Sequence, residues 1–277
     1  MTHARIDARF AALKAQGRAA FIAYVMAGDP DLERSFQILQ GLPKAGADLI
    51  ELGFPFSDPM AEGPPIQRAA QRALASGATL RKTLAMVRRF REQDTDTPII
   101  LMGYLNPVLS MGFEAFASAA GDCGVDGLII VDCPPEEAGP LADALDLAGV
   151  SLIRLAAPTT DDARLAIVAK RTSGFMYYVS VAGVTGAKEA DAEAVAPAVV
   201  RVRAASGLPV AVGFGIRTPE RAAAIARVAD AAVVGSALVE IVAEALESNE
   251  AISPKVLAKA AELAQAVHSA RETAGGG

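Results

Sequence analysis

The chain has 277 residues, of which 52% are hydrophobic and 21% charged, and it carries a formal net charge of −6. That composition is typical of a chain that folds around an apolar core, and it excludes an intrinsically disordered protein. The acidic balance also excludes a nucleic-acid-binding surface, because no run of five or more basic residues occurs. The densest basic group, Arg88, Arg89 and Arg91, is expected on a solvated helix face.

Cysteine and histidine are too scarce to build a metal site. Cys123 and Cys133 are the only cysteines, and His3 and His268 are the only histidines. We expect two reduced, buried thiols and a reducing compartment. The first ten residues lack the apolar segment of a signal peptide, and no apolar stretch is long enough to span a bilayer. The sequence therefore predicts a cytoplasmic protein that binds neither metal nor membrane.

The expected secondary structure alternates between helices and strands. A helix from Arg5 to Gln16 is expected first, and eight short apolar segments follow it. Their consecutive apolar residues are typical of strands that are covered on both faces. The eight segments are Phe21–Met26, Asp48–Leu52, Pro98–Met102, Gly127–Val131, Ser151–Leu155, Phe175–Ser180, Pro209–Val212 and Asp230–Val234.

The segments between these strands have helical periodicity, as at Leu80, Leu84 and Val87. Such alternation indicates parallel strands, and eight units in about 250 residues favour a closed (β/α)₈ TIM barrel. An open doubly wound sheet would have Gly-x-Gly-x-x-Gly after an early strand, and this chain has none there. We therefore expect a single α/β barrel domain over residues 1–277, with an extra N-terminal helix and a disordered tail at 271–277.

Glycine clusters follow the last three expected strands: Gly183 to Gly186, Gly213-Phe214-Gly215, and Gly235-Ser236. In barrels of this kind, phosphate groups often bind after the seventh and eighth strands, at backbone N–H groups and a helix N-terminus. The clusters therefore favour a phosphate site at one rim. Each glycine taken singly is equally consistent with a tight turn.

Three carboxyl groups lie at or after the end of the second strand. Glu51 has apolar neighbours, and strand alternation can direct it into the barrel mouth, where burial raises the pKa of a carboxyl. Asp58 and Glu62 follow in a proline-rich loop. The alternatives are a buried Glu51 satisfied by an ion pair, and helix-capping or surface roles for the two loop acids.

Taken together, these motifs resemble the tryptophan synthase α subunit family along nearly the whole chain. The most specific block runs from Glu51 to Pro59 as Glu-Leu-Gly-Phe-Pro-Phe-Ser-Asp-Pro. Other matching residues are Gly28-Asp29-Pro30, Gly63-Pro64, Ile66-Gln67, Tyr104, Asn106-Pro107, Asp132, Pro134, Gly183-Val184-Thr185-Gly186, Gly213-Phe214-Gly215-Ile216 and Gly235-Ser236-Ala237.

The resemblance implies a carbon–carbon lyase of L-tryptophan biosynthesis. Members cleave indole-3-glycerol phosphate to indole and D-glyceraldehyde 3-phosphate by a retro-aldol reaction, without a metal or a cofactor of their own. They pass the indole to a β subunit, which carries pyridoxal phosphate, in an α₂β₂ heterotetramer. By this resemblance Asp58, Asn106 and Pro107 face the partner.

The resemblance also implies roles for individual residues. Glu51 is the catalytic acid–base, and Tyr177 is the tyrosine beside it, although Tyr177 also fits an ordinary core position. Thr185 helps to close the site. Phosphate is expected at Gly186, Gly213, Gly215, Gly235 and Ser236, and the indole pocket is expected to be lined by Phe21, Met102, Leu128 and Phe214, which also fit ordinary core.

Three positions depart from the family pattern. Glu62 stands where the family has an aspartate that faces the indole N–H, Pro65 replaces a threonine, and Val181 replaces an arginine. The additional methylene of Glu62 displaces its carboxyl by about 1 Å if the backbone stays in place, and such shifts can cost about 100-fold in rate. We expect the loop backbone to retreat so that activity survives.

Three rival functions remain at this point. The first is another enzyme of the phosphate-binding barrel group, and the second is an indole producer that works without a β subunit. The third is an inactive binding module that activates a partner. A Schiff-base aldolase is disfavoured, because no lysine stands at a strand end.

Overall fold

The computed structural model describes residues 4–180, 192–213 and 215–272. Its strands are β1 Ala20–Met26, β2 Leu49–Gly53, β3 Ile99–Gly103, β4 Gly127–Ile130, β5 Ser151–Ala156, β6 Met176–Val179, β7 Val210–Gly213 and β8 Ala231–Val234. They form a closed barrel in which every strand is parallel to its neighbours and β8 pairs back with β1. The predicted TIM barrel is confirmed.

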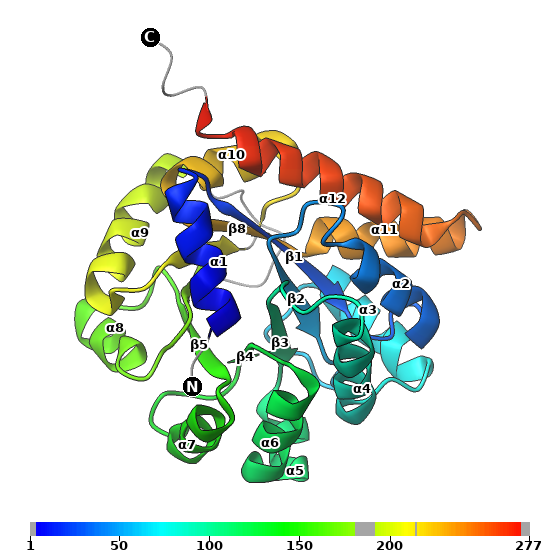
Figure 1. Cartoon of the computed structure of the whole chain (residues 1–277), viewed down its shortest axis with the longest axis horizontal. Coiled ribbons are helices and arrows are strands. Elements are labelled where there is room, and N and C mark those ends of the chain that lie inside the picture. Colours follow the sequence, from blue (N-terminus) through cyan, green and yellow to red (C-terminus); the bar gives the residue numbers. More distant parts are fainter. Residues whose placement is uncertain (1–3, 181–191, 214, 273–277) are drawn as a thin grey trace.

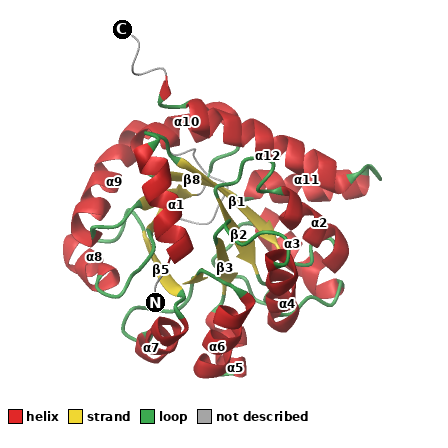
Figure 2. Ribbon diagram, viewed as in Figure 1, coloured by secondary structure: helices red, strands yellow, loops and turns green. Residues whose placement is uncertain are grey.

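Helices surround the barrel on the outside, as Figures 1 and 2 show. They are α1 Ala4–Ala15, α2 Leu32–Gly41, α3 Pro64–Ala75, α4 Leu80–Arg91, α5 Leu105–Met111, α6 Phe113–Cys123, α7 Gly139–Ala148, α8 Asp162–Ala169, α9 Ala192–Ser206, α10 Pro219–Val228, α11 Ser236–Glu247 and α12 Ile252–Ser269. Several helices begin where the sequence supplies a side-chain cap. At the start of α10, the Thr218 hydroxyl accepts a hydrogen bond from the Arg221 amide, and Pro219 is the first residue of the helix.

The strands are apolar on consecutive residues because each is covered on both faces. In β1, Ile22 belongs to the core inside the barrel, whereas Phe21 and Ala23 belong to the core layer between strands and helices. The same alternation continues around the barrel, with Leu101 outside and Met102 inside on β3. A slip of one residue in any strand would exchange the two faces.

Helix α1 closes the N-terminal end of the barrel. Figure 1 shows it lying across the ring of strands, and its buried residues Ile6, Phe10 and Leu13 belong to the interior core. The ring of Phe10 lies 5.7 Å from that of Phe175, next to β6. Because apolar side chains close this end, we expect a polar active site at the opposite end of the barrel, where the strands finish.

A buried carboxylate fastens α1 and α4 to the start of β4. Asp126 accepts from Arg5 Nη1 at 2.8 Å, from Arg91 Nη2 at 2.7 Å and from the Ile99 amide at 2.8 Å. The expectation that Arg91 lies on a solvated face is therefore wrong. Its guanidinium is largely buried, and this burial lowers its pKa.

Replacing Asp126 with Ala is expected to lower the free energy of unfolding by about 3–5 kcal/mol, because it takes the nearest carboxylate from the largely buried Arg91 guanidinium and the acceptor from the buried Ile99 amide. Urea unfolding of the parent and the variant measures the change. The matched control is Asp162→Ala, which breaks the exposed ion pair with Arg201, and it should cost less than about 1 kcal/mol. Equal losses in the two variants would contradict this role of Asp126.

The end of the described chain is attached to the barrel. Arg271 Nε donates to the Ala226 carbonyl at 2.8 Å, and Arg271 Nη2 donates to the Ala229 carbonyl at 2.6 Å. The disordered tail expected at 271–277 stays a prediction, and within it Arg271 is held by two carbonyl groups. Residues 273–277 lie outside the described residues.

Candidate active site

Glu51 is a buried carboxyl inside the barrel, near the end where the strands finish. It is the third residue of β2, in register with Tyr24 of β1 and Ile100 of β3, and it is 1% exposed. Its Oε1 has no hydrogen-bond partner, and it forms no ion pair with a described residue. Burial, and next the charge of Glu62, raise the pKa of Glu51 to about 8. A carboxyl with such a pKa can both donate and accept a proton near neutral pH.

Glu62 supplies the second buried carboxyl. It lies in the connection of residues 54–63 between β2 and α3, and it is 8% exposed. Burial raises its pKa to about 7. Its charge acts on the pKa values of Glu51 and Tyr177, so these groups share one electrostatic environment. Asp58, in the same connection, is exposed and does not belong to this group.

Two buried tyrosines extend toward the same carboxyls. Burial, and next Glu51 and Glu62, raise the pKa of Tyr177 on β6 well above its ordinary value. Burial, and next the same two acids, raise the pKa of Tyr24 on β1 as well. Both phenols therefore remain protonated at neutral pH.

Each tyrosine hydroxyl occupies space left by a glycine on the neighbouring strand. A Cβ on Gly53 would overlap the hydroxyl of Tyr24, and a Cβ on Gly213 would overlap the hydroxyl of Tyr177. The two glycines thus make room for the phenols. Gly213 was predicted to bind phosphate or to serve a tight turn, and this further role was not predicted.

Tyr24 is a site residue that the sequence analysis missed. Its place beside Glu51 is set by the register between β1 and β2, which the sequence alone does not give. Alternation from Ile22 within β1 also directs Tyr24 inward, with the Phe21 side chain outward.

The predicted pocket residues fall into two groups. Met102 faces the interior of the barrel, as expected. Phe21 and Leu128 belong to the outer layer under the helices, so the expectation that they line the pocket is wrong. The inward residue beside Leu128 is Ile129. Phe214 lies outside the described residues.

The predicted phosphate residues that are described lie together at the ends of β7 and β8. Gly213 ends β7, and Gly215 follows it with a positive φ of 75°. Gly235 ends the connection from β8 and Ser236 begins the 12-residue helix α11, so the helix N-terminus points its free amides toward this rim. Gly186 and Thr185 lie outside the described residues.

The predicted partner residues lie on the same end of the barrel, beyond β2 and β3. Asp58 and Asn106 are exposed, and Pro107 is partly exposed. Two large apolar side chains are exposed in these same connections, Met60 at 75% and Leu109 at 56%. Single exposed apolar side chains are common on protein surfaces, whereas a contiguous apolar patch marks a surface that binds another protein.

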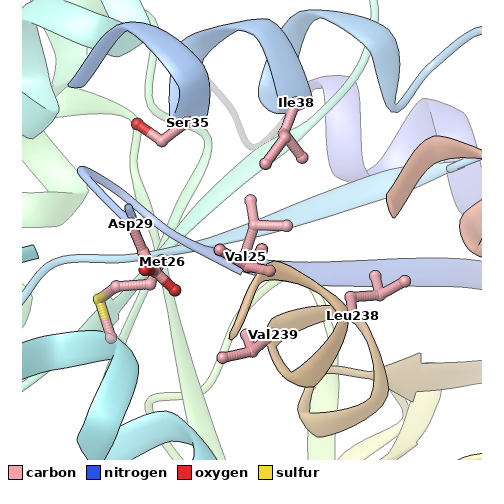
Figure 3. A pocket seen from close by; sticks show the side chains of 8 residues that line it. Val25, Met26, Asp29, Ser35, Ile38, Leu238 and Val239 are labelled. Carbon is pink, nitrogen blue, oxygen red and sulfur yellow. The ribbon is translucent and has the colours of Figure 1, made fainter. Parts of the chain in front are cut away.

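A small cavity lies apart from these carboxyls, between β1, α2 and α11. Figure 3 shows Ile38 of α2 pointing toward Val25 near the end of β1, with Leu238 and Val239 of α11 on the other side, and Met26 and Ser35 also line the cavity. Asp29 also lines it, but both of its carboxylate oxygens accept from Arg72, at 2.7 and 2.8 Å. The cavity therefore offers apolar walls and a satisfied ion pair.

Metal-ligand clusters and membrane spans are not found in the part of the chain that the structure describes. No three or more His, Cys, Asp or Glu side chains gather there in a way that could hold a metal ion. Within the same residues, no helix has the length and hydropathy needed to cross a membrane. Cys123 is buried and Cys133 is half-buried, and neither forms a disulfide.

A closed (β/α)₈ barrel with two buried carboxyls of raised pKa near its mouth is typical of an enzyme. Residues 10–268 match the family model described as the tryptophan synthase alpha chain. The chain belongs to the tryptophan synthase alpha chain family.

Individual relatives agree with this assignment. The tryptophan synthase alpha chain of Caulobacter sp. (strain K31) is 72% identical over 98% of this chain and 98% of its own length. The tryptophan synthase subunit alpha of Legionella pneumophila str. Paris superimposes with a TM-score of 0.89, at 42% identity, over 96% of this chain and 98% of the other. A Mycobacterium tuberculosis tryptophan synthase chain has a TM-score of 0.86 at 38% identity, over 95% and 98%. The predicted family, its lyase class and its place in tryptophan biosynthesis are confirmed.

Proposed function

We propose that this chain cleaves indole-3-glycerol phosphate to indole and D-glyceraldehyde 3-phosphate, with Glu51 as the acid and then the base. The observation that carries the proposal is the Glu51 carboxyl, which is 1% exposed and has an Oε1 without a hydrogen-bond partner among the described residues. A buried polar atom left unpaired costs folding free energy, and such atoms are typically kept for function.

The reaction needs two proton transfers. Protonation of indole C3 turns the ring into a leaving group, and the bond from C3 to the glycerol chain then breaks with its electrons returning to the ring. The hydroxyl on the adjacent carbon loses its proton and becomes the aldehyde. Glu51, with a pKa of about 8, is protonated at neutral pH, so it donates the first proton and as a carboxylate accepts the second.

Glu62 serves as the countercharge in this proposal. Protonation at C3 places positive charge on the ring nitrogen, and a carboxylate facing the ring N–H stabilises that charge. Glu62, with a pKa of about 7, is the more readily ionised of the two buried acids. The protonated phenols of Tyr24 and Tyr177 supply hydrogen-bond donors beside the reacting atoms.

The substrate phosphate binds at the opposite side of the mouth, at Gly213, Gly215, Gly235 and Ser236. The first turn of α11 supplies free backbone amides and partial positive charge, and the Ser236 hydroxyl adds a donor. Anchoring the phosphate there leaves the indole ring to extend over the inward-facing Met102 and Ile129.

The two carboxyl pKa values predict a bell-shaped pH profile. The value of kcat/KM should rise as Glu62 loses its proton near pH 7 and fall as Glu51 loses its proton near pH 8. Initial rates of indole release at low substrate, from about pH 5.5 to about pH 9.5, measure the profile. A profile that stays flat across this range would contradict the assigned protonation states.

The partner is a β subunit in an α₂β₂ heterotetramer. Support comes from Met60 and Leu109, which are exposed beside Asp58 and Asn106 at the mouth. The solved relatives include chains from structures of Mycobacterium tuberculosis tryptophan synthase.

Indole release from indole-3-glycerol phosphate, measured with and without a β subunit, tests the function and separates its rivals. Release that rises strongly with the β subunit supports the proposal. Equal release in both conditions identifies an enzyme that works alone. No release in either condition identifies a binding module or a barrel enzyme with another substrate.

A further inference from the structure

Glu62 lies outside the helices and strands, so its connection must be held by other contacts. The amide of Glu62 donates to the Pro59 carbonyl at 3.1 Å within residues 54–63, and Gly63 then begins α3. No described residue donates a hydrogen bond to the Glu62 carboxyl itself. The position of that carboxyl therefore depends on what fixes the backbone on either side of it.

Tyr104 holds this backbone from the β3 side. It follows Gly103 at the end of β3, it is 3% exposed, and its hydroxyl accepts from the Ala61 amide at 3.0 Å. Its ring stacks on that of Phe56 from the same connection, with centroids 5.3 Å apart and planes at 28°. Tyr104 thus contacts residues 54–63 at two points, one of them the residue before Glu62.

Gln67 holds the same backbone from the α3 side. Its Nε2 donates to the Glu62 carbonyl at 2.9 Å and to the Pro59 carbonyl at 3.4 Å. Tyr104 therefore bonds the peptide that joins Met60 to Ala61, and Gln67 bonds the peptide that joins Glu62 to Gly63. Ala61 itself is exposed, so packing of its side chain does not replace these bonds.

We propose that Tyr104 and Gln67 are positioning residues that together set where the Glu62 carboxyl stands relative to the substrate. Neither has to touch a reacting atom for this role, because each acts through a hydrogen bond to the backbone beside Glu62. The inference rests on the proposed function, in which Glu62 faces the ring nitrogen.

This role has a signature that simple loss of stability lacks. Burial raises the pKa of Glu62 to about 7. If the contact with Tyr104 or with Gln67 is lost, residues 54–63 move and water reaches the Glu62 carboxyl. The pKa of Glu62 then falls toward 4.5, and the acidic limb of the kcat/KM profile moves to lower pH. A variant that is only less stable keeps the limb where it is.

The experiment uses Tyr104→Phe and Gln67→Met, each assayed for indole release in complex with a β subunit. Tyr104→Phe keeps the stacked ring and removes the acceptor, and Gln67→Met keeps the length of the side chain and removes the donor. We expect kcat to fall about 10-fold to 100-fold, since a shift of about 1 Å in a catalytic group has effects of this size. The acidic limb should move down by about half a pH unit or more.

Tyr178→Phe is the matched control. Tyr178 is a buried tyrosine on β6 that belongs to the outer core layer, so its variant should keep both the rate and the pH limb. Circular dichroism melts confirm that each variant is folded at the assay temperature, and Gln67→Met, at a half-buried position, provides the test if Tyr104→Phe does not fold.

The proposal is overturned if both folded variants keep kcat within about threefold and the limb in place, while the parent chain releases indole normally. A parent chain that releases no indole would instead refute the proposed function, so the two failures are distinguishable.

Discussion

Glu51→Gln should reduce cleavage of indole-3-glycerol phosphate by about 10³-fold or more, because general acid–base groups contribute about 10²–10⁴-fold and Glu51 is assigned to both proton transfers. The amide fits the same space but cannot donate or accept the proton at these pH values. Single-turnover indole release in the complex with a β subunit measures the loss. Cleavage at near-normal speed would refute the assignment of Glu51.

The same substitution should make the folded chain more stable at alkaline pH. The pKa of Glu51 is about 8 in the folded state and about 4.5 in its ordinary environment. The folded state therefore binds the Glu51 proton more tightly than the unfolded state does. This stabilisation is fully present below pH 4.5 and is lost as pH rises through 8, at about 1.4 kcal/mol per pKa unit. Melting temperatures of Glu51→Gln and the parent should diverge as the pH increases.

The matched comparison is Asp58→Asn, which neutralises an exposed acid in the connection just after β2. Its effect on melting temperature should be small at every pH, because an exposed carboxyl interacts weakly with its surroundings. If Glu51→Gln lost stability at pH 9, the carboxyl would instead be satisfied by a partner in the folded state.

Glu62→Gln should reduce kcat about 10²-fold to 10³-fold, because an amide cannot neutralise the charge that develops on the ring nitrogen. The loss should fall on kcat more than on KM, since that charge exists only after C3 is protonated. Steady-state kinetics in the presence of a β subunit measure both constants.

Glu62→Asp provides the companion measurement. We expect kcat to change by less than about 100-fold, because we predict that the backbone of residues 54–63 retreats to accommodate the longer side chain. An increase of about 100-fold or more would show that Glu62 stands out of place and that the backbone does not accommodate it.

The strand pattern could be predicted because the apolar segments are short, rich in Val and Ile, and separated by helical periodicity. The expected first strand, Phe21–Met26, differs from β1 by one residue, and the expected second, Asp48–Leu52, is shifted by one from β2. Glu51 could be placed as well, because an acid that stands between apolar residues in the interior of a strand marks which face leads to the mouth.

The inward face of the other strands could not be predicted in the same way. Where both faces of a strand are apolar, the residue types do not distinguish interior from exterior, and Phe21 and Leu128 were assigned to the wrong side for this reason. Only the register between strands resolves the choice, as it does for Tyr24 opposite Glu51. The ion pairs of Asp126 join residues up to 121 positions apart, and no local pattern marks them.

Tyr24 lies over Gly53 and Tyr177 lies over Gly213, each on the neighbouring strand. The shape of the barrel mouth therefore depends on these two residue pairs and not on single residues. Adding one methyl group at either glycine would displace a phenol, although that methyl need not touch the substrate. Redesign of this enzyme for a bulkier or smaller aromatic substrate should therefore alter the members of each pair together. Libraries that vary one position at a time would discard variants that function only in combination.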